Sequence, residues 1–204
     1  MATPGGTEPK ARLVLASASP RRRHLLEQVL LPPDAVAPAD VDESPRRGEL
    51  PRPHAQRLAD DKAAAMAPAY PGDFVLAADT VVGVGRRILP KAETEADARR
   101  CLELLSGRRH HVFTGVTLIA PDGKARRRTV DTAVIFKRLG ETELAAYLAS
   151  GEWHGKAGGY AIQGLAAAFI RAVNGSYTNV VGLPVFEIVS LLAGAGYGPA
   201  RNLR

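Results

Sequence analysis

The sequence predicts an α/β or α+β protein built around a mixed sheet. Short apolar runs that are typical of strands are interspersed with helical patterns along the whole chain. No internal repeat and no long linker divides the 204 residues, a length that suits one domain, compact or elongated with two lobes. Apolar residues make up 46% of the chain and charged residues 24%, which are ordinary values for a folded soluble protein.

The N-terminal half predicts two strands and two helices. The first helix starts at Ser19-Pro20, because serine is a favoured N-cap and proline fits the first helical turn, and Pro32-Pro33 stops it. An acidic extended segment and a mobile loop rich in proline and arginine precede the second helix. The expected ranges are 12–16 for the first strand, 34–43 for the acidic segment, 44–52 for the loop, 54–67 for the second helix and 74–84 for a central strand that contains Asp79-Thr80.

The C-terminal half predicts three helices, a strand pair and a glycine-rich segment. Helices are expected over 94–105, 141–149 and 184–195, the first two closed by glycines, and paired strands over 111–119 and 129–136 around the turn PDGK. The glycine-rich segment 155–182 holds strand candidates at 167–173 and 177–181. The single cysteine, Cys101, excludes an intrachain disulfide and is expected to fill the core from its helix.

The ends of the chain and its charge set broad expectations. We expect tails at 1–11 and 198–204 around a domain spanning 12–197. The N-terminus lacks the apolar core of a signal peptide, and no apolar run approaches the ~20 residues of a membrane span, so a cytoplasmic location without membrane contact is expected. The net charge of +6 suits an anionic partner, either nucleic acid or a phosphorylated small molecule.

Cations gather where the first helix is expected to begin, in ASASPRRRHLL. A helix N-terminus is already positive, so Arg21, Arg22 and Arg23 oppose it unless an anion lies nearby. Free N–H groups, the Ser17 hydroxyl and the guanidinium groups would all bind such an anion. The alternative is a solvated basic patch.

Carboxylates form a second set of candidates. Asp79 interrupts the apolar strand FVLAADTVVGV, where a buried carboxylate needs a partner, and it is a candidate metal ligand or general base, or else a capping residue. Asp40, Asp42 and Glu43 offer hard oxygen ligands of the kind that Mg²⁺ or Mn²⁺ prefers, although acidic loops are more often simply solvated.

Two lysines and a glutamine complete the candidates. Lys62 and Lys91 are suited to phosphate, with surface lysines as the alternative reading. Gln163, within GGYAIQG, can both donate and accept, which suits reading a base edge, or it is the polar tip of a turn. The chain carries no GxxxxGK[ST] loop and no GxSxG elbow, so a P-loop NTPase and an α/β-hydrolase are excluded.

Several motifs follow one another along the chain in the order SASPRRRHLL, VDES, LADDKAAA, AADTVV, LSGRRHHVFTGV, GKAGGYAIQGLAAAF and NGSYTNVVGLP. Together they resemble the motifs of the Maf family of nucleotide pyrophosphatases. The resemblance covers nearly the whole chain, from Leu13 to Leu192. It implies an elongated single α/β domain, with a mixed twisted sheet flanked by helices and a central cleft. It also implies hydrolysis of nucleoside triphosphates to the monophosphate and pyrophosphate with a divalent cation, Mg²⁺ or Mn²⁺, and a homodimer.

The resemblance implies a role for each candidate. Phosphates would be held by Ser17, Arg21 and Arg22, with Lys62 and Lys91 as further phosphate contacts at the catalytic centre. Asp79 would be the catalytic acid–base residue, and Glu43 would bind the metal together with Asp79. Arg22, Thr80 and Gln163 match the branch that acts on dTTP and UTP rather than the branch that acts on 7-methyl-GTP.

Three departures from the family pattern carry expectations. Pro90-Lys91-Ala92 reverses the usual lysine–proline order and shifts the lysine, and Leu165-Ala166 replaces a glycine and stiffens the loop after Gln163. Asp61 is an extra acid expected to reduce the charge of Lys62. Two other functions stay open: a pyrophosphatase for other or modified nucleotides, and a basic nucleic-acid-binding or cell-division regulatory protein supported by residues 126–128. The low aromatic content of 5% argues against a stable nucleic-acid partner.

Overall fold

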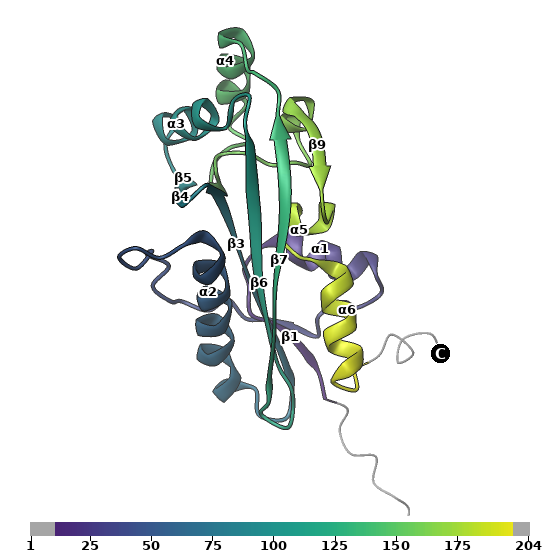
Figure 1. The fold of residues 1–204 in the computed structure, drawn as a ribbon. Coiled ribbons are helices and arrows are strands. Elements are labelled where there is room, and N and C mark those ends of the chain that lie inside the picture. The colour runs from purple at the N-terminus through teal and green to yellow at the C-terminus, as the bar shows by residue number, and fades with distance from the viewer. Residues whose placement is uncertain (1–10, 198–204) are drawn as a thin grey trace, which may run out of the picture.

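A mixed sheet forms the centre of the molecule in a computed structural model that describes residues 11–197 (Figure 1). Within that range its strands are β1 (Leu13–Leu15), β2 (Ala35–Val36), β3 (Phe74–Val84), β4 (Arg87–Leu89), β6 (Arg109–Ile119), β7 (Ala125–Phe136) and β9 (Ile170–Asn174). They lie in the order β2-β1-β3-β6-β7-β9, with β4 beside β3. β1 is parallel to β2 and β3, and the other pairs are antiparallel.

Helices cover both faces of this sheet. They are α1 (Pro20–Gln28), α2 (Pro51–Met66), α3 (Glu95–Leu105), α4 (Glu141–Ser150), α5 (Tyr177–Val181) and α6 (Val185–Gly194), with 3₁₀ turns η1 (Ala67–Ala69) and η2 (Leu165–Phe169). A small apolar cluster joins Val75 and Ala77 to Ala63 of α2, while the larger cluster joins the opposite face to α1, α3, α4 and α6. Alternate residues of β3 therefore pack against different helices. The long strands β3, β6 and β7 give the elongated shape (Figure 1).

Two short strands form a separate sheet next to the long one. β5 (Lys91–Ala92) pairs antiparallel with β8 (Lys156–Ala157), so segments about 65 residues apart in sequence lie side by side. This pairing places the glycine-rich segment 155–182 beside the residues that follow β4. Segments from the two halves of the chain are thereby brought together.

Helix α2 lies unusually close to β6, because a glycine faces it. A Cβ atom on Gly115 would lie 2.3 Å from the carbonyl oxygen of Ala55, so only glycine allows this approach. Gly83 of β3 likewise faces Pro51 at the start of α2, where a Cβ would lie 2.7 Å from the proline ring. Gly115 is the register partner of Asp79 across β3 and β6, so the close approach occurs next to that aspartate.

Most predicted elements are confirmed, and their differences have local causes. The second helix begins at Pro51 rather than residue 54, since proline is tolerated in a first turn, and the end of the expected loop 44–52 therefore belongs to α2. The first helix ends at Gln28, ahead of Pro32-Pro33, with Leu30 in the left-handed region at φ 58°. Cys101 is buried in α3, as expected.

The strand expected at 177–181 is wrong. These residues form α5, because the Ser176 hydroxyl caps the turn by accepting the Asn179 backbone N–H at 3.2 Å. The strand expected at 167–173 begins only at Ile170, after η2. The predicted tails at 1–11 and 198–204 lie outside the described residues, apart from Ala11.

Candidate active site

One cavity of about 400 Å³ gathers all the residues to which the family resemblance assigned a role. They come from the turn after β1, α1, the loop after β2, α2, β3, β5 and the glycine-rich segment. The residues are Ser17, Arg21, Arg22, Glu43, Lys62, Asp79, Thr80, Lys91 and Gln163. The fold therefore joins motifs that are up to 146 positions apart, while Asp40 and Asp42 are exposed and do not line the cavity.

Two carboxylates converge on one lysine inside the cavity. The Lys62 Nζ lies 2.6 Å from Glu43 Oε1 and 2.6 Å from Asp79 Oδ1, and Lys91 contacts the other oxygen of Glu43. Asp79 and Lys62 are only 4% and 7% exposed, so each needs the other for charge compensation. Burial raises the pKa of Glu43, but hydrogen bonds from Lys62 and Lys91 outweigh it and lower that pKa to about 2. Glu43 is accordingly ionised throughout the neutral range.

The start of α1 presents cations to the same cavity. Arg22 donates to the Gly182 carbonyl at 2.8 Å, to Ser17 Oγ at 3.0 Å and to Thr80 Oγ1 at 3.1 Å. These acceptors are neutral, and within residues 11–197 no carboxylate forms an ion pair with Arg21 or Arg22. Burial lowers the pKa of both arginines. A helix N-terminus with uncompensated, partly buried guanidinium groups is suited to an anion.

The other half of the basic turn has a different role. Arg23 is exposed and pairs with Glu27 at 2.7 Å, one turn along α1. His24 is also exposed and lies 3.1 Å from the Gln28 side chain. The solvated-patch reading thus holds for Arg23 and His24, while Arg21 and Arg22 face the cavity.

Behind Thr80 lies a polar cluster that sequence reasoning missed. Thr80 Oγ1 lies 3.0 Å from Thr114 Oγ1, which in turn donates to the Asn179 carbonyl. The buried Asn179 amide donates to Val112 O and to Thr132 Oγ1, both at 3.0 Å. These bonds hold Thr80 and α5 in place beside the cavity. The motif NGSYTNVVGLP contained the signal, since a buried asparagine is expected to be hydrogen-bonded.

Gln163 lies at the open edge of the cavity. Its side chain is exposed, on the turn between β8 and η2. The turn is held by Glu152, whose Oε2 accepts the Leu165 backbone N–H at 2.8 Å. A Cβ on Gly164 would lie 2.0 Å from that carboxylate oxygen, so a larger residue there would displace the Glu152 side chain. Gln163 is thus presented on a fixed turn and not on a free loop.

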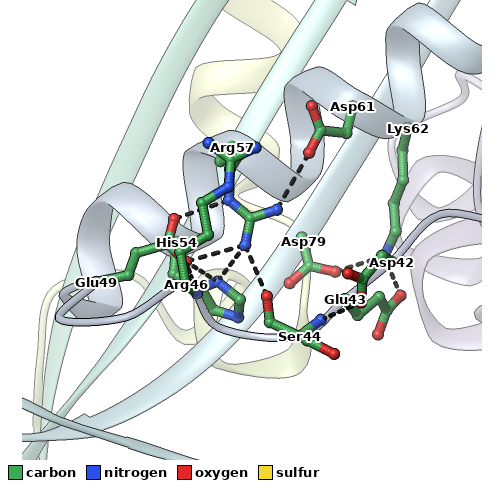
Figure 2. A network of polar contacts seen from close by, with 10 residues as sticks. All are labelled: Asp42, Glu43, Ser44, Arg46, Glu49, His54, Arg57, Asp61, Lys62 and Asp79. Atoms are coloured by element: carbon green, nitrogen blue, oxygen red, sulfur yellow. Dashed lines mark hydrogen bonds and ion pairs between the residues drawn. The ribbon is translucent and has the colours of Figure 1, made fainter.

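The loop that carries Glu43 is fastened to α2 by Arg57 (Figure 2). Arg57 donates to Ser44 O at 3.0 Å and to both oxygens of Glu49 at 2.8 and 2.9 Å. The Arg57 hydrogen bond is the main cause that lowers the pKa of Glu49 to about 2. Arg57 also lies 3.2 Å from Asp61, so the expectation that Asp61 reduces the charge of Lys62 is wrong: Asp61 pairs with Arg57 instead.

The donor set fits a divalent cation only in part. Within the described chain, no group of three or more histidine, cysteine, aspartate or glutamate side chains could hold a metal alone. Glu43 and Asp79 nevertheless converge on a single point, which Lys62 Nζ takes. Mg²⁺ commonly uses one or two protein carboxylates and completes its shell with substrate phosphates and water. The pair therefore fits a cation that arrives with a phosphorylated ligand.

Fold and site together define an α/β protein with a cavity suited to a small polyanion beside a pair of carboxylates. No helix among residues 11–197 is both long and apolar enough to cross a membrane. The chain belongs to the Maf family, because the Maf-like protein family matches residues 12–195.

The chain is also similar to individual relatives and to solved structures. A dTTP/UTP pyrophosphatase of Paramagnetospirillum magneticum is 66% identical, over 93% of this chain and 100% of the relative. The dTTP/UTP pyrophosphatase of Caulobacter vibrioides is 65% identical, over 92% of this chain and 97% of the relative. Among solved structures, the Ham1 protein of Staphylococcus aureus matches 61% of this chain over 71% of its own chain, with 20% sequence identity and a TM-score of 0.45.

Proposed function

We propose that this protein is a nucleoside triphosphate pyrophosphatase that hydrolyses dTTP and UTP to the monophosphate and pyrophosphate. The observation that carries the proposal is the cavity, in which Arg21 and Arg22 face the cluster of Glu43, Lys62 and Asp79. Relatives that are 57–66% identical over more than nine-tenths of the chain are described as dTTP/UTP pyrophosphatases, which supports the substrate class.

The charges of the cavity suit a triphosphate. The substrate carries about four negative charges at neutral pH, and the uncompensated Arg21 and Arg22 would bind its phosphates. Ser17 and Thr80 fix the Arg22 guanidinium in place before substrate arrives, so little reorganisation is needed. Glu43 and Asp79 are the residues that would hold Mg²⁺ or Mn²⁺, which would neutralise charge at the reacting phosphate.

The proposed reaction is attack of water on the α-phosphorus, with pyrophosphate leaving in line. Asp79 accepts the proton of the attacking water, because it is a buried carboxylate in the cavity with Lys62 held against one of its oxygens. Lys62 and Lys91 keep Glu43 ionised, Lys62 also pairs with Asp79, and both lysines balance charge that develops on the phosphate oxygens. Positioning and electrostatics supply the rate, as in other phosphoryl-transfer reactions.

The nucleic-acid-binding alternative has less support. In the basic run Arg126–Arg128, Arg126 lies 3.9 Å from Asp122 and Arg127 lies 2.9 Å from Asp60. Two of its three charges are thus compensated within the chain. A homodimer, a cytoplasmic location and the absence of a stable nucleic-acid partner stay predictions from the sequence.

A panel of nucleoside triphosphates tests the function. We expect pyrophosphate release from dTTP and UTP at least about 10-fold faster, in kcat/KM, than from ATP, GTP or 7-methyl-GTP. Activity should need Mg²⁺ or Mn²⁺ and vanish with EDTA. Higher kcat/KM on 7-methyl-GTP would contradict the proposed substrates, and the absence of release from every nucleotide would contradict the proposed activity.

Replacing Gln163 tests the reading of the base. A glutamate at this position keeps the shape but cannot donate a hydrogen bond, so Gln163→Glu should raise KM for dTTP and UTP about 10-fold. Inhibition by inorganic pyrophosphate should change less than twofold, because the side chain is not a phosphate contact. Gln28→Glu, on the exposed side of α1, is the matched control. Equal losses with every nucleotide would argue that Gln163 does not contact the base.

A further inference from the structure

Lys156 lines the cavity, although no motif argument singled it out. It lies in β8, whose pairing with β5 sets Lys156 opposite Ala92 and Ala157 opposite Lys91. The neighbours Gly155 and Ala157 line the cavity as well. The two-stranded sheet thus brings a second lysine to the same wall as Lys91.

The cations of the cavity fall into two groups. Lys62 and Lys91 are compensated by Glu43 and Asp79. Arg21, Arg22 and Lys156 have no carboxylate partner at ion-pair distance among residues 11–197. The described lining carries five cationic side chains and only two carboxylates, which leaves an excess of positive charge.

Arg22 is less available than the other two uncompensated cations. Its Nε and both terminal nitrogens already donate to Gly182, Ser17 and Thr80. Among the described residues, the Lys156 Nζ donates only to the His154 carbonyl, at 2.9 Å. Burial lowers the pKa of Lys156, and the positive charge of Arg21 lowers it further against the smaller opposing effect of Glu152, so Arg21 and Lys156 repel each other when no anion lies between them.

We propose that Lys156 is a phosphate-binding residue which, together with Arg21, holds the pyrophosphate end of the substrate. The proposal rests on the proposed function and assigns the two ends of the triphosphate within the cavity. Glu43 and Asp79 would repel the β- and γ-phosphates, so these phosphates lie at Arg21 and Lys156, which form no ion pair with a carboxylate among residues 11–197. The α-phosphate, which must reach Asp79, lies at the other end. Binding of pyrophosphate relieves the repulsion between Arg21 and Lys156.

Titration with inorganic pyrophosphate by calorimetry, at fixed Mg²⁺, tests this assignment without any turnover. Lys156→Met should weaken pyrophosphate binding about 10-fold or more, and Lys156→Arg should restore most of it. Binding of dTMP should change less than twofold. In steady-state assays, KM for the triphosphate should rise more than kcat falls. Lys124→Met, in the exposed turn between β6 and β7, removes an equal charge and should change neither ligand.

Several outcomes would overturn the proposal. One is unchanged pyrophosphate binding in Lys156→Met, and another is an equal loss for pyrophosphate and dTMP, which would indicate a structural role through His154. A third is no binding of pyrophosphate by the unmodified protein. If pyrophosphate binding depends on Lys156 but no nucleoside triphosphate is hydrolysed, the proposed function fails while the phosphate site stands.

Discussion

Asp79→Asn is expected to lower kcat for dTTP hydrolysis about 1,000-fold, because asparagine cannot accept the proton of the attacking water. The side chains have the same shape, and the asparagine oxygen can still accept the hydrogen bond from Lys62. Lys62 also keeps its contact with Glu43, so the loss of stability should be limited to about 1–3 kcal/mol. Steady-state kinetics and thermal unfolding of the purified variant measure both effects.

Asp131→Asn is the matched control for this variant. Asp131 lies on β7, is partnered by His111 at 2.7 Å and does not line the cavity. Its kcat should stay within twofold of the unmodified protein. If Asp79→Asn kept more than a tenth of the original kcat while folded, Asp79 would not be the base.

Lys62→Met should lower kcat/KM about 100-fold and move the acid limb of the pH profile to higher pH. The change removes the cation shared by Glu43 and Asp79 while it keeps an unbranched side chain of similar length. Burial then raises the pKa of Glu43 with only Lys91 to oppose it, so the carboxyl needs a higher pH to ionise. The profile of kcat/KM between pH 5 and 9 measures the shift.

The same variant should bind divalent cations more tightly. Without Lys62, Asp79 loses its cationic partner and Glu43 keeps only Lys91, so the two carboxylates present a larger net negative charge to Mg²⁺ or Mn²⁺. The rise in melting temperature on addition of Mn²⁺ should therefore be larger in Lys62→Met than in the unmodified protein. Lys137→Met, whose partner is Glu143 outside the cavity, should show no such difference. An unchanged pH profile and an unchanged response to Mn²⁺ would contradict the role given to Lys62.

Some cavity residues could be found from the sequence because each combined an unfavourable local chemistry with a defined place, whereas Thr80 was named only through the family resemblance. Asp79 interrupts an apolar strand, and Arg21 and Arg22 stand at a helix start that disfavours cations. Such local conflicts indicate a ligand, and all of these side chains do line one cavity. Their chemical roles stay predictions, since positions alone do not measure reactivity.

What the sequence did not reveal depends on contacts between distant segments. Asp61 precedes Lys62 in the chain but points to Arg57, because neighbours in a helix are turned about 100° apart. Lys156 was missed because only the pairing of β8 with β5 brings it to the cavity. The helix at 177–181 was missed because a segment rich in tyrosine, threonine and valine favours a strand by propensity, while the Ser176 cap favours a helical turn.

The absence of a side chain at Gly115 determines how well the reacting groups are aligned. Helix α2 rests there on bare main chain, and the same helix supplies Lys62 and, through Arg57, fixes the loop of Glu43. The distance from Lys62 and Glu43 to Asp79 is thus set by direct contact between the backbones of α2 and β6, which a change of side-chain rotamer cannot alter. A single methyl group added at Gly115 would push α2 away from β6 and would displace Lys62 and Glu43 without contacting either of them.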